Sequence, residues 1–179
     1  LVLSIVDGDD RRVWLRAHQR LLAAKRDSPP VEGWLEHEAA VRQVLTSVAV
    51  HYDAGDVDAM LEHFDSDIVY ASMLGECVGL EAVRENFEGL VERFAASVHL
   101  LLNVSVWIES RTVAHAASYL HAVVQTVEGT GYGLGAGYSD RLVHARGHWR
   151  IVRREVADGL TWRTVPIDPA TRLDSPESS

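Results

Sequence analysis

The sequence predicts an α+β fold in which three helices pack on one face of a curved antiparallel sheet. Two observations predict it. Apolar residues recur at three- and four-residue steps up to about residue 96, which is typical of helices, and the period then changes to two, which is typical of strands. The four strand-like segments that follow are joined by the short links "SR", "EGTG" and "ARG", which suit hairpins. Helices followed by an antiparallel meander indicate an α+β domain.

The composition is that of an ordinary globular protein. The chain has 179 residues, of which 47% are hydrophobic and 24% are charged, and its formal net charge is −9. A negative chain offers no basic surface to phosphates, so nucleic acid is not an expected partner. The arginines of "WRIVRR" alternate with apolar residues and are expected to lie on one solvated face of a sheet.

The cysteine count and the first residues bear on location. Cys77 is the only cysteine, so no disulfide forms within the chain and no cysteine-based zinc site can be built, which fits a reducing cytoplasm. The opening "LVLSIVDGDD" lacks a basic region and is too short to span a bilayer. We therefore expect no signal peptide, no membrane partner and a cytoplasmic protein.

Three segments are expected along the chain: a helical extension over 1–33, the core domain over 34–165, and a flexible tail over 166–179. The extension contains a helix over 9–27 that ends in Lys25 and Arg26 and places Trp14, Leu21 and Leu22 on a similar face. The sequence "DSPPVEG" then ends that helix. The tail is rich in Pro, Ser and acidic residues.

The core is predicted to open with three helices. The first has the apolar stripe Val41, Val44, Leu45, Val48 and Tyr52, and Gly55 follows as its C′ residue. Asp56 caps the second, whose stripe is Val57, Met60, Leu61 and Phe64. The short strand "DIVYAS" and a glycine-flanked loop lead to the third helix, with Leu80, Val83, Phe87, Leu90, Val91 and Phe94 at helical steps.

Long strands are predicted over 97–109, 112–127, 132–144 and 148–156, and alternation sorts their polar residues by face. His99 and Asn103 fall on one face of the first strand, His121 and Gln125 on one face of the second, and Tyr138 on one face of the third. On the face opposite Tyr138 lie Gly133, Gly135 and Gly137, which permit strong curvature or a close approach of backbone, or else mark a bulge without functional meaning.

The segments "HYDAGDVDAMLEHFDSDIVY", "VHLLLN" and "GYSDRLVHARGHWRI" resemble the SnoaL-like group of the nuclear-transport-factor-2-like superfamily over about 38–156. By motif the chain resembles scytalone dehydratase, bile acid 7α-dehydratase and hexachlorocyclohexane dehydrochlorinase within this group. The resemblance implies a cone-shaped domain in which the helices and the bent sheet enclose a cavity. It also implies a homo-oligomer, either a trimer or a dimer.

The resemblance further implies which residues form the site. The family's Tyr–Asp pair at the end of the first helix matches Tyr52 and Asp53, its strand tyrosine matches Tyr70, and its histidine on the first long strand matches His99. On the second strand Gln125 stands where scytalone dehydratase has its second histidine, and His121, earlier on the same face, is the expected substitute. Asn103 and Tyr138 complete the set expected to line the cavity.

These residues predict a cofactor-independent lyase of the dehydratase type. His99 would remove a proton from carbon, Asp53 would orient and stabilise its imidazole, and tyrosine hydroxyls would polarise a small apolar or polyketide-like substrate. The alternatives are a polyketide cyclase or isomerase with the same pocket, and a non-catalytic ligand-binding or assembly subunit. The nine histidines show no HxH or HExxH spacing, so no metal is expected.

Overall fold

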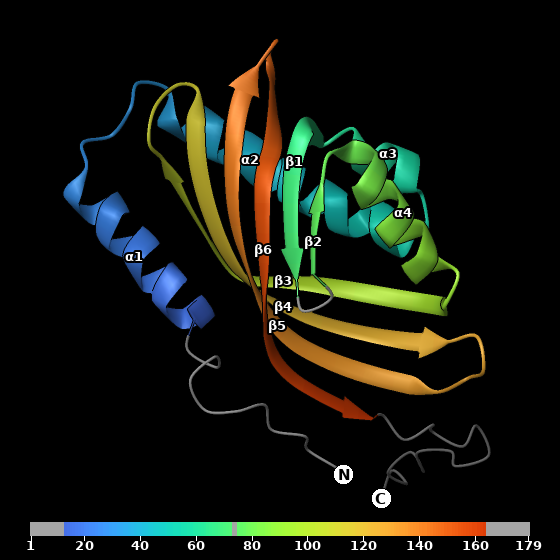
Figure 1. Ribbon diagram of the computed structural model, residues 1–179. Helices are drawn as coiled ribbons and strands as arrows, with labels where there is room; N and C mark the ends of the chain where they lie inside the picture. The colour runs from blue at the N-terminus through green and yellow to red at the C-terminus, as the bar shows by residue number, and fades with distance from the viewer. Residues whose placement is uncertain (1–12, 73–74, 164–179) are drawn as a thin grey trace, which may run out of the picture.

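The computed structural model describes residues 13–72 and 75–163, which contain one six-stranded sheet with the order β2-β1-β6-β5-β4-β3 (Figure 1). The strands are β1 (Phe64–Ser72), β2 (Gly75–Val78), β3 (Phe94–Ile108), β4 (Val113–Thr126), β5 (Gly131–Ala145) and β6 (His148–Arg163). The helices are α1 (Val13–Asp27), α2 (Trp34–Asp53), α3 (Val57–Leu61) and α4 (Leu80–Val91). The tail 166–179, the opening residues and the start of the predicted helix over 9–27 lie outside the described residues.

The predicted meander is confirmed, because β3, β4, β5 and β6 pair in sequence order and all three pairings are antiparallel. The sheet also extends to the segment before residue 96, which sequence analysis assigned mainly to helices. β1 runs parallel to β6, and the predicted glycine-flanked loop contains β2, which pairs antiparallel with β1. A four-residue strand is too short to show a clear alternation, so β2 could not be predicted from its pattern of apolar residues.

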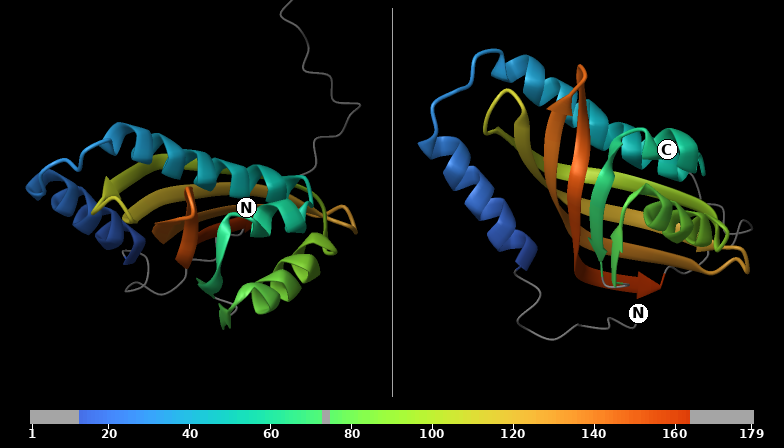
Figure 2. Two further views of the ribbon diagram at one scale, coloured as in Figure 1. Left: turned by 90° about the horizontal axis from the view of Figure 1, so that it is seen from above. Right: turned by 45° about the horizontal axis from the view of Figure 1, so that its top comes forward.

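The sheet curves so that α2, α3 and α4 enclose its concave face, while α1 packs on the other side. Figure 2 shows α2 and α1 with the ends of β3 and β4 between them. The imidazole of His18 on α1 bonds to Ser105 Oγ on β3 at 2.9 Å and contacts the ring of Tyr119 on β4 edge-on. Of the residues predicted to share a face of α1, Leu21 is buried but Leu22 is exposed.

The helix boundaries follow from the capping residues. Gly55, at φ 71°, follows the end of α2, and the N–H groups of Gly55 and Asp56 bond to the carbonyls of Tyr52 and His51 in a Schellman arrangement. The Asp56 carboxylate accepts the N–H of Ala59 and caps α3, as predicted. α3 ends at Leu61, so Phe64 begins β1 instead of continuing the helical stripe.

The main core lies between the concave face and these helices. It combines Val41, Leu45 and Val48 of α2 with buried side chains from α3, α4 and every strand except β2: Met60, Phe64, Ile68, Val83, Phe87, Val106, Ala114, Leu142 and Ile151. Burying these side chains stabilises the fold by roughly 1.5–3 kcal/mol for each large one. Of the helices in the described residues, none is long and apolar enough to cross a bilayer.

Two β-bulges decide which side chains reach the concave face. On β3 the register shifts between Leu102 and Ser105, where Asn103 adopts a left-handed φ of 51°. On β6 the register shifts between Ile151 and Arg153. Because each bulge adds one residue, the alternation of side chains is reversed beyond it.

Candidate active site

A cavity of about 280 Å³ opens between α2, α4 and the concave face of the sheet. Most of its wall is carbon, and the polar groups are few. The apolar lining comprises Leu45, Val48, Ala49, Met60, Phe87, Leu90, Phe94, Leu101, Leu120, Ala122, Val124, Leu134 and Val156, and the polar lining comprises Tyr52, Tyr70, Ser72, Asn86, His99, Tyr138 and Arg154. An apolar pocket with a few convergent polar groups has the character of a small-molecule site.

The end of α2 places Tyr52 and Asp53 beside β3. The Schellman turn stops the helix directly after Asp53, so the carboxylate projects from the last helical turn toward the first residues of β3. A carboxylate is electrostatically unfavourable at a helix C-terminus, because the dipole there favours cations. Compensating hydrogen-bond donors are therefore required.

The donors come from β3. Asp53 Oδ1 lies 2.5 Å from His99 Nδ1 and accepts the Ser97 hydroxyl at 2.8 Å, while Oδ2 accepts the backbone N–H of His99 at 2.7 Å. These contacts hold the carboxylate and the imidazole in one relative position. Because Nδ1 is engaged by Asp53, the lone pair of neutral His99 is left on Nε2. Ser97 was not among the predicted site residues, although its spacing of two from His99 puts it on the same face of the strand.

Tyr52 and Tyr70 extend the site from the dyad along α4. The ring of Tyr52 meets His99 edge-on, with 4.6 Å between ring centroids, and meets Phe87 at 5.4 Å. Tyr70 meets Phe87 from another side at 5.2 Å. Burial, followed by the nearby Tyr138 and Asp53, raises the pKa of Tyr52 to about 12, and burial also raises the pKa of Tyr70. Both phenols therefore keep their protons at neutral pH.

Tyr138 lies against a buried ion pair. Asp140 on β5 and Arg154 on β6 are direct cross-strand neighbours, and Nε and Nη2 of the guanidinium donate to the two carboxylate oxygens at 2.6 and 3.0 Å. The guanidinium carbon lies 4.4 Å from the centroid of the Tyr138 ring. Burial alone would lower the pKa of Arg154, but the charge and hydrogen bonds of Asp140 outweigh that effect and raise it. Burial raises the pKa of Tyr138 to about 12.

Arg154 corrects the expectation that the arginines of "WRIVRR" share one solvated face. The side chain of Arg153 is 42% exposed, whereas Arg154 is buried and lines the cavity. The β6 bulge causes the difference, because Trp149 and Ile151 face the core before it and Arg154 and Val156 do so after it. One available signal was Asp140, an acidic residue that alternation places on the same face as Tyr138 and that needs a cationic partner when buried.

The structure brings five of the eight predicted residues together. Tyr52, Tyr70, His99 and Tyr138 line the cavity, and Asp53 bonds to His99 at its edge.

The expectation that the other three predicted residues line the cavity is wrong. Asn103 sits in the β3 bulge and is exposed, because the bulge turns the strand there. On β4 the lining residues are Leu120, Ala122 and Val124, so His121 and Gln125 belong to the opposite, convex face. The correct face of β4 follows from its register with β3, in which Leu100, an outward residue, pairs with His121.

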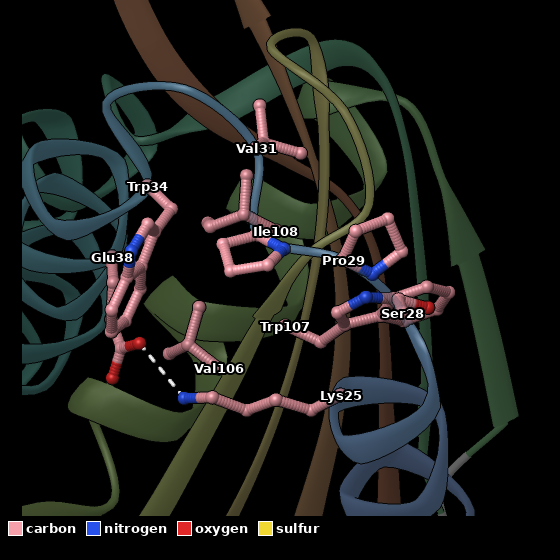
Figure 3. Close-up of a pocket in the computed structure, with 10 residues that line it drawn as sticks. Lys25, Ser28, Pro29, Val31, Trp34, Glu38, Val106, Trp107 and Ile108 are labelled. Carbon is pink, nitrogen blue, oxygen red and sulfur yellow. Dashed lines mark hydrogen bonds and ion pairs between the residues drawn. The ribbon is translucent and has the colours of Figure 1, made fainter.

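A second, smaller cavity of about 100 Å³ lies where the chain passes from α1 to α2 around the edge strand β3 (Figure 3). Figure 3 shows Pro29, Val31 and Ile108 around it, with the Lys25–Glu38 ion pair, at 2.9 Å, along one side. It holds no imidazole and is separate from the larger cavity. Within residues 13–72 and 75–163, no group of three or more His, Cys, Asp or Glu side chains is arranged to hold a metal ion.

The sequence model of the SnoaL-like domain matches residues 34–155. The chain belongs to the SnoaL-like domain family. No match was found among curated proteins. The match begins at the first residue of α2, so α1 precedes the family domain.

Solved structures share the fold at low sequence identity. A scytalone dehydratase-like protein from Novosphingobium aromaticivorans superposes with a TM-score of 0.69 and 21% identity, covering 74% of this chain and 91% of that one. A hexachlorocyclohexane dehydrochlorinase, LinA Type2, gives a TM-score of 0.69 and 13% identity, covering 74% and 92%. A nuclear transport factor 2-like protein from Salmonella enterica gives 0.64 and 16%, covering 72% and 93%. These likenesses show the NTF2-like fold of this SnoaL-like protein.

Proposed function

We propose that this SnoaL-like protein is a lyase of the dehydratase type in which the Asp53–His99 dyad removes a proton from a carbon of a small substrate. The observation that carries the proposal is the pair of hydrogen bonds from His99 to Asp53, one of which engages Nδ1 beside an apolar cavity. The names of two structural neighbours, a dehydratase and a dehydrochlorinase, support an elimination on this fold.

The elimination needs one base and one group that stabilises negative charge. His99 Nε2 takes the proton, and the electron pair of the broken C–H bond forms a carbon–carbon double bond as the bond to the leaving hydroxyl breaks. Asp53 stabilises the imidazolium that forms. The imidazolium then returns its proton to the departing hydroxide, so the substrate loses water and the enzyme is regenerated.

Arg154 and the tyrosines are placed to stabilise the charge that develops on the substrate. Two donors of the guanidinium bond to Asp140, and Arg154 is among the residues that line the cavity. Protonated Tyr70 and Tyr138 add hydroxyl donors beside it. Preorganised donors in a site that excludes water are a large source of rate enhancement. The chain itself supplies every group that this step needs, so we propose no cofactor.

Proton abstraction can be tested before the natural substrate is known. We expect the protein to catalyse exchange of the methyl protons of acetophenone for deuterium in D₂O, followed by NMR. His99→Ala should reduce the exchange rate by a factor on the order of 10²–10⁴, the usual contribution of a positioned general base. Asp53→Asn should also reduce it strongly, because a neutral amide does not stabilise the imidazolium.

His115→Ala is the matched control. His115 also bonds to a carboxylate, that of Glu109 at 2.7 Å, but it lies on the convex face. Its removal should leave the exchange rate unchanged. Equal exchange rates in the folded His99→Ala and wild-type proteins would refute the proposal and favour a binding or assembly role.

We also propose self-association through the convex face, as a dimer or a trimer. Val98, Leu100, Leu102 and Val123 are large apolar side chains that are exposed there on adjacent strands. A second copy that covers them would remove this apolar surface from water. Sedimentation velocity measures the oligomer directly, and a monomer at micromolar concentration would refute the proposal.

A further inference from the structure

The cavity limits the size of what it can hold. Its volume of about 280 Å³ corresponds to about nine water molecules at ~30 Å³ each. This is slightly below the range of roughly 300–1,000 Å³ that is usual for ligand pockets. The ring of Phe87 contacts the rings of both Tyr52 and Tyr70 edge-on. This packing limits expansion of the cavity wall there. A ligand with one ring, or with two fused rings, matches this space.

The charges around the cavity do not favour an anion. Among the described residues that line it, Arg154 is the one permanent cation, and the carboxylate of Asp140 neutralises it through two hydrogen bonds. His99 must be neutral to act as a base, and Asp53 then contributes a formal negative charge at the edge of the cavity that Arg154, already paired with Asp140, does not balance. The four groups together carry a charge of −1, which opposes the entry of a carboxylate.

The other polar groups are mainly donors. Arg154, Tyr70 and Tyr138 all line the cavity, and the close contact between the Arg154 guanidinium and the Tyr138 ring places these two on the same side of the lining. A guanidinium has no acceptor atom. A ligand therefore gains most by presenting an oxygen that accepts hydrogen bonds here, and it loses little by being otherwise apolar.

We propose that the cavity selects neutral one- or two-ring carbonyl compounds and that the charge of Asp53 excludes carboxylates of the same shape. The selection deepens the proposed function and rests on it, because only a bound carbonyl group brings an acidic C–H to the base. In this arrangement the carbonyl oxygen lies at Arg154 and the tyrosines, and the adjacent carbon faces Nε2 of His99. Asp53 thus serves both as partner of the base and as a filter for charge.

Three probes of nearly equal shape test the proposal: acetophenone, benzoate and α-methylstyrene. Affinities measured by ligand-observed NMR at pH 8 should rank acetophenone first. α-Methylstyrene should bind several-fold more weakly, because it has no acceptor for the donors. Benzoate should bind at least about tenfold more weakly than acetophenone, because it meets the negative charge of Asp53 at short range.

Asp53→Asn removes that charge with almost no change of shape. It should raise the affinity for benzoate by about tenfold while changing the affinity for acetophenone by less than about twofold, since acetophenone is uncharged. Asp67→Asn is the matched control, because it removes the same charge from an exposed position on β1. It should leave the ratio of the two affinities unchanged.

Two results would overturn the charge filter: wild-type protein that binds benzoate as tightly as acetophenone, or an affinity ratio that Asp53→Asn leaves unchanged. The exchange rate of His99→Ala separates this failure from failure of the proposed function. If His99→Ala abolishes exchange and benzoate still binds as well as acetophenone, the base stands and the filter is wrong. If exchange is unaffected, the proposed function is wrong, whatever the affinities are.

Discussion

Among the described residues two imidazole–carboxylate pairs lie on opposite faces of the sheet, one with His99 of β3 and the other with His115 of β4. Asp53–His99 lies at the concave cavity, where the side chains are 23% and 13% exposed, and Glu109–His115 lies on the convex face, where they are 48% and 31% exposed. Asp53 holds His99 through Nδ1, whereas Glu109 bonds to Nε2 of His115, whose ring stacks on Trp107. Both sites therefore pair an imidazole with a carboxylate. They differ in how far the pair is enclosed and in which ring nitrogen bonds to the carboxylate.

The same contrast recurs at other positions. The buried Asp140–Arg154 pair has an exposed neighbour in the Arg153–Glu155 pair, at 2.8 Å on the same strand. Tyr138 lines the cavity and has an exposed counterpart in Tyr132. Leu101 also lines the cavity, and the residue before it, Leu100, is exposed. Each pair keeps the residue type and changes the surroundings. Paired substitutions therefore measure what enclosure contributes.

The two arginines should show the largest difference in stability. Arg154→Ala leaves the carboxylate of Asp140 buried without a partner, and we expect it to lower the free energy of unfolding by about 3–5 kcal/mol. Arg153→Ala breaks an exposed pair and should cost less than about 1 kcal/mol. Urea denaturation measures both. The double variant Arg154→Met/Asp140→Leu should regain most of the loss, and equal effects of the two single variants would contradict this account.

The tyrosines make the stability sensitive to alkaline pH. The pKa of Tyr138 is raised by burial from 10.0 to about 12, so the stability it contributes is complete below pH 10 and is lost as the pH rises towards 12. Two pH units correspond to about 3 kcal/mol. Tyr138→Phe should therefore flatten the fall in unfolding free energy between pH 10 and 12, measured by urea denaturation. Tyr132→Phe, at an exposed ring, should leave the fall as it is in the wild type.

The residues that could be predicted from the sequence lie before the bulges. The helix-ending glycine places Asp53 at the end of α2, and alternation over 96–102, where β3 is regular, places His99 on one face of the strand; the family resemblance then indicates that the two meet at the cavity. Asn103 was misplaced and Arg154 was missed because each depends on a bulge, and one inserted residue reverses every later side chain. The prediction that His121 and Gln125 of β4 line the cavity was wrong for a different reason. Alternation separates two faces but does not tell which one is concave.

The smallest difference is expected between the two leucines, which are adjacent in β3 and opposite in environment. Leu101 packs against both apolar clusters of the interior, whereas Leu100 is 47% exposed. Leu101→Ala should lower the free energy of unfolding by about 2 kcal/mol, at the low end for a buried leucine because Leu101 is only partly buried. In dilute solution Leu100→Ala should change it by no more than about 0.5 kcal/mol, as is usual for surface substitutions.

Sedimentation velocity should give the opposite order. Leu100→Ala removes apolar surface from the patch proposed for self-association and should shift the protein toward the monomer, while Leu101→Ala should leave the oligomer unchanged at concentrations where the variant is folded. If Leu100→Ala instead destabilised the isolated chain as much as Leu101→Ala, another part of the chain must cover the convex face. The enclosed and open faces would then differ in chemistry but not in burial.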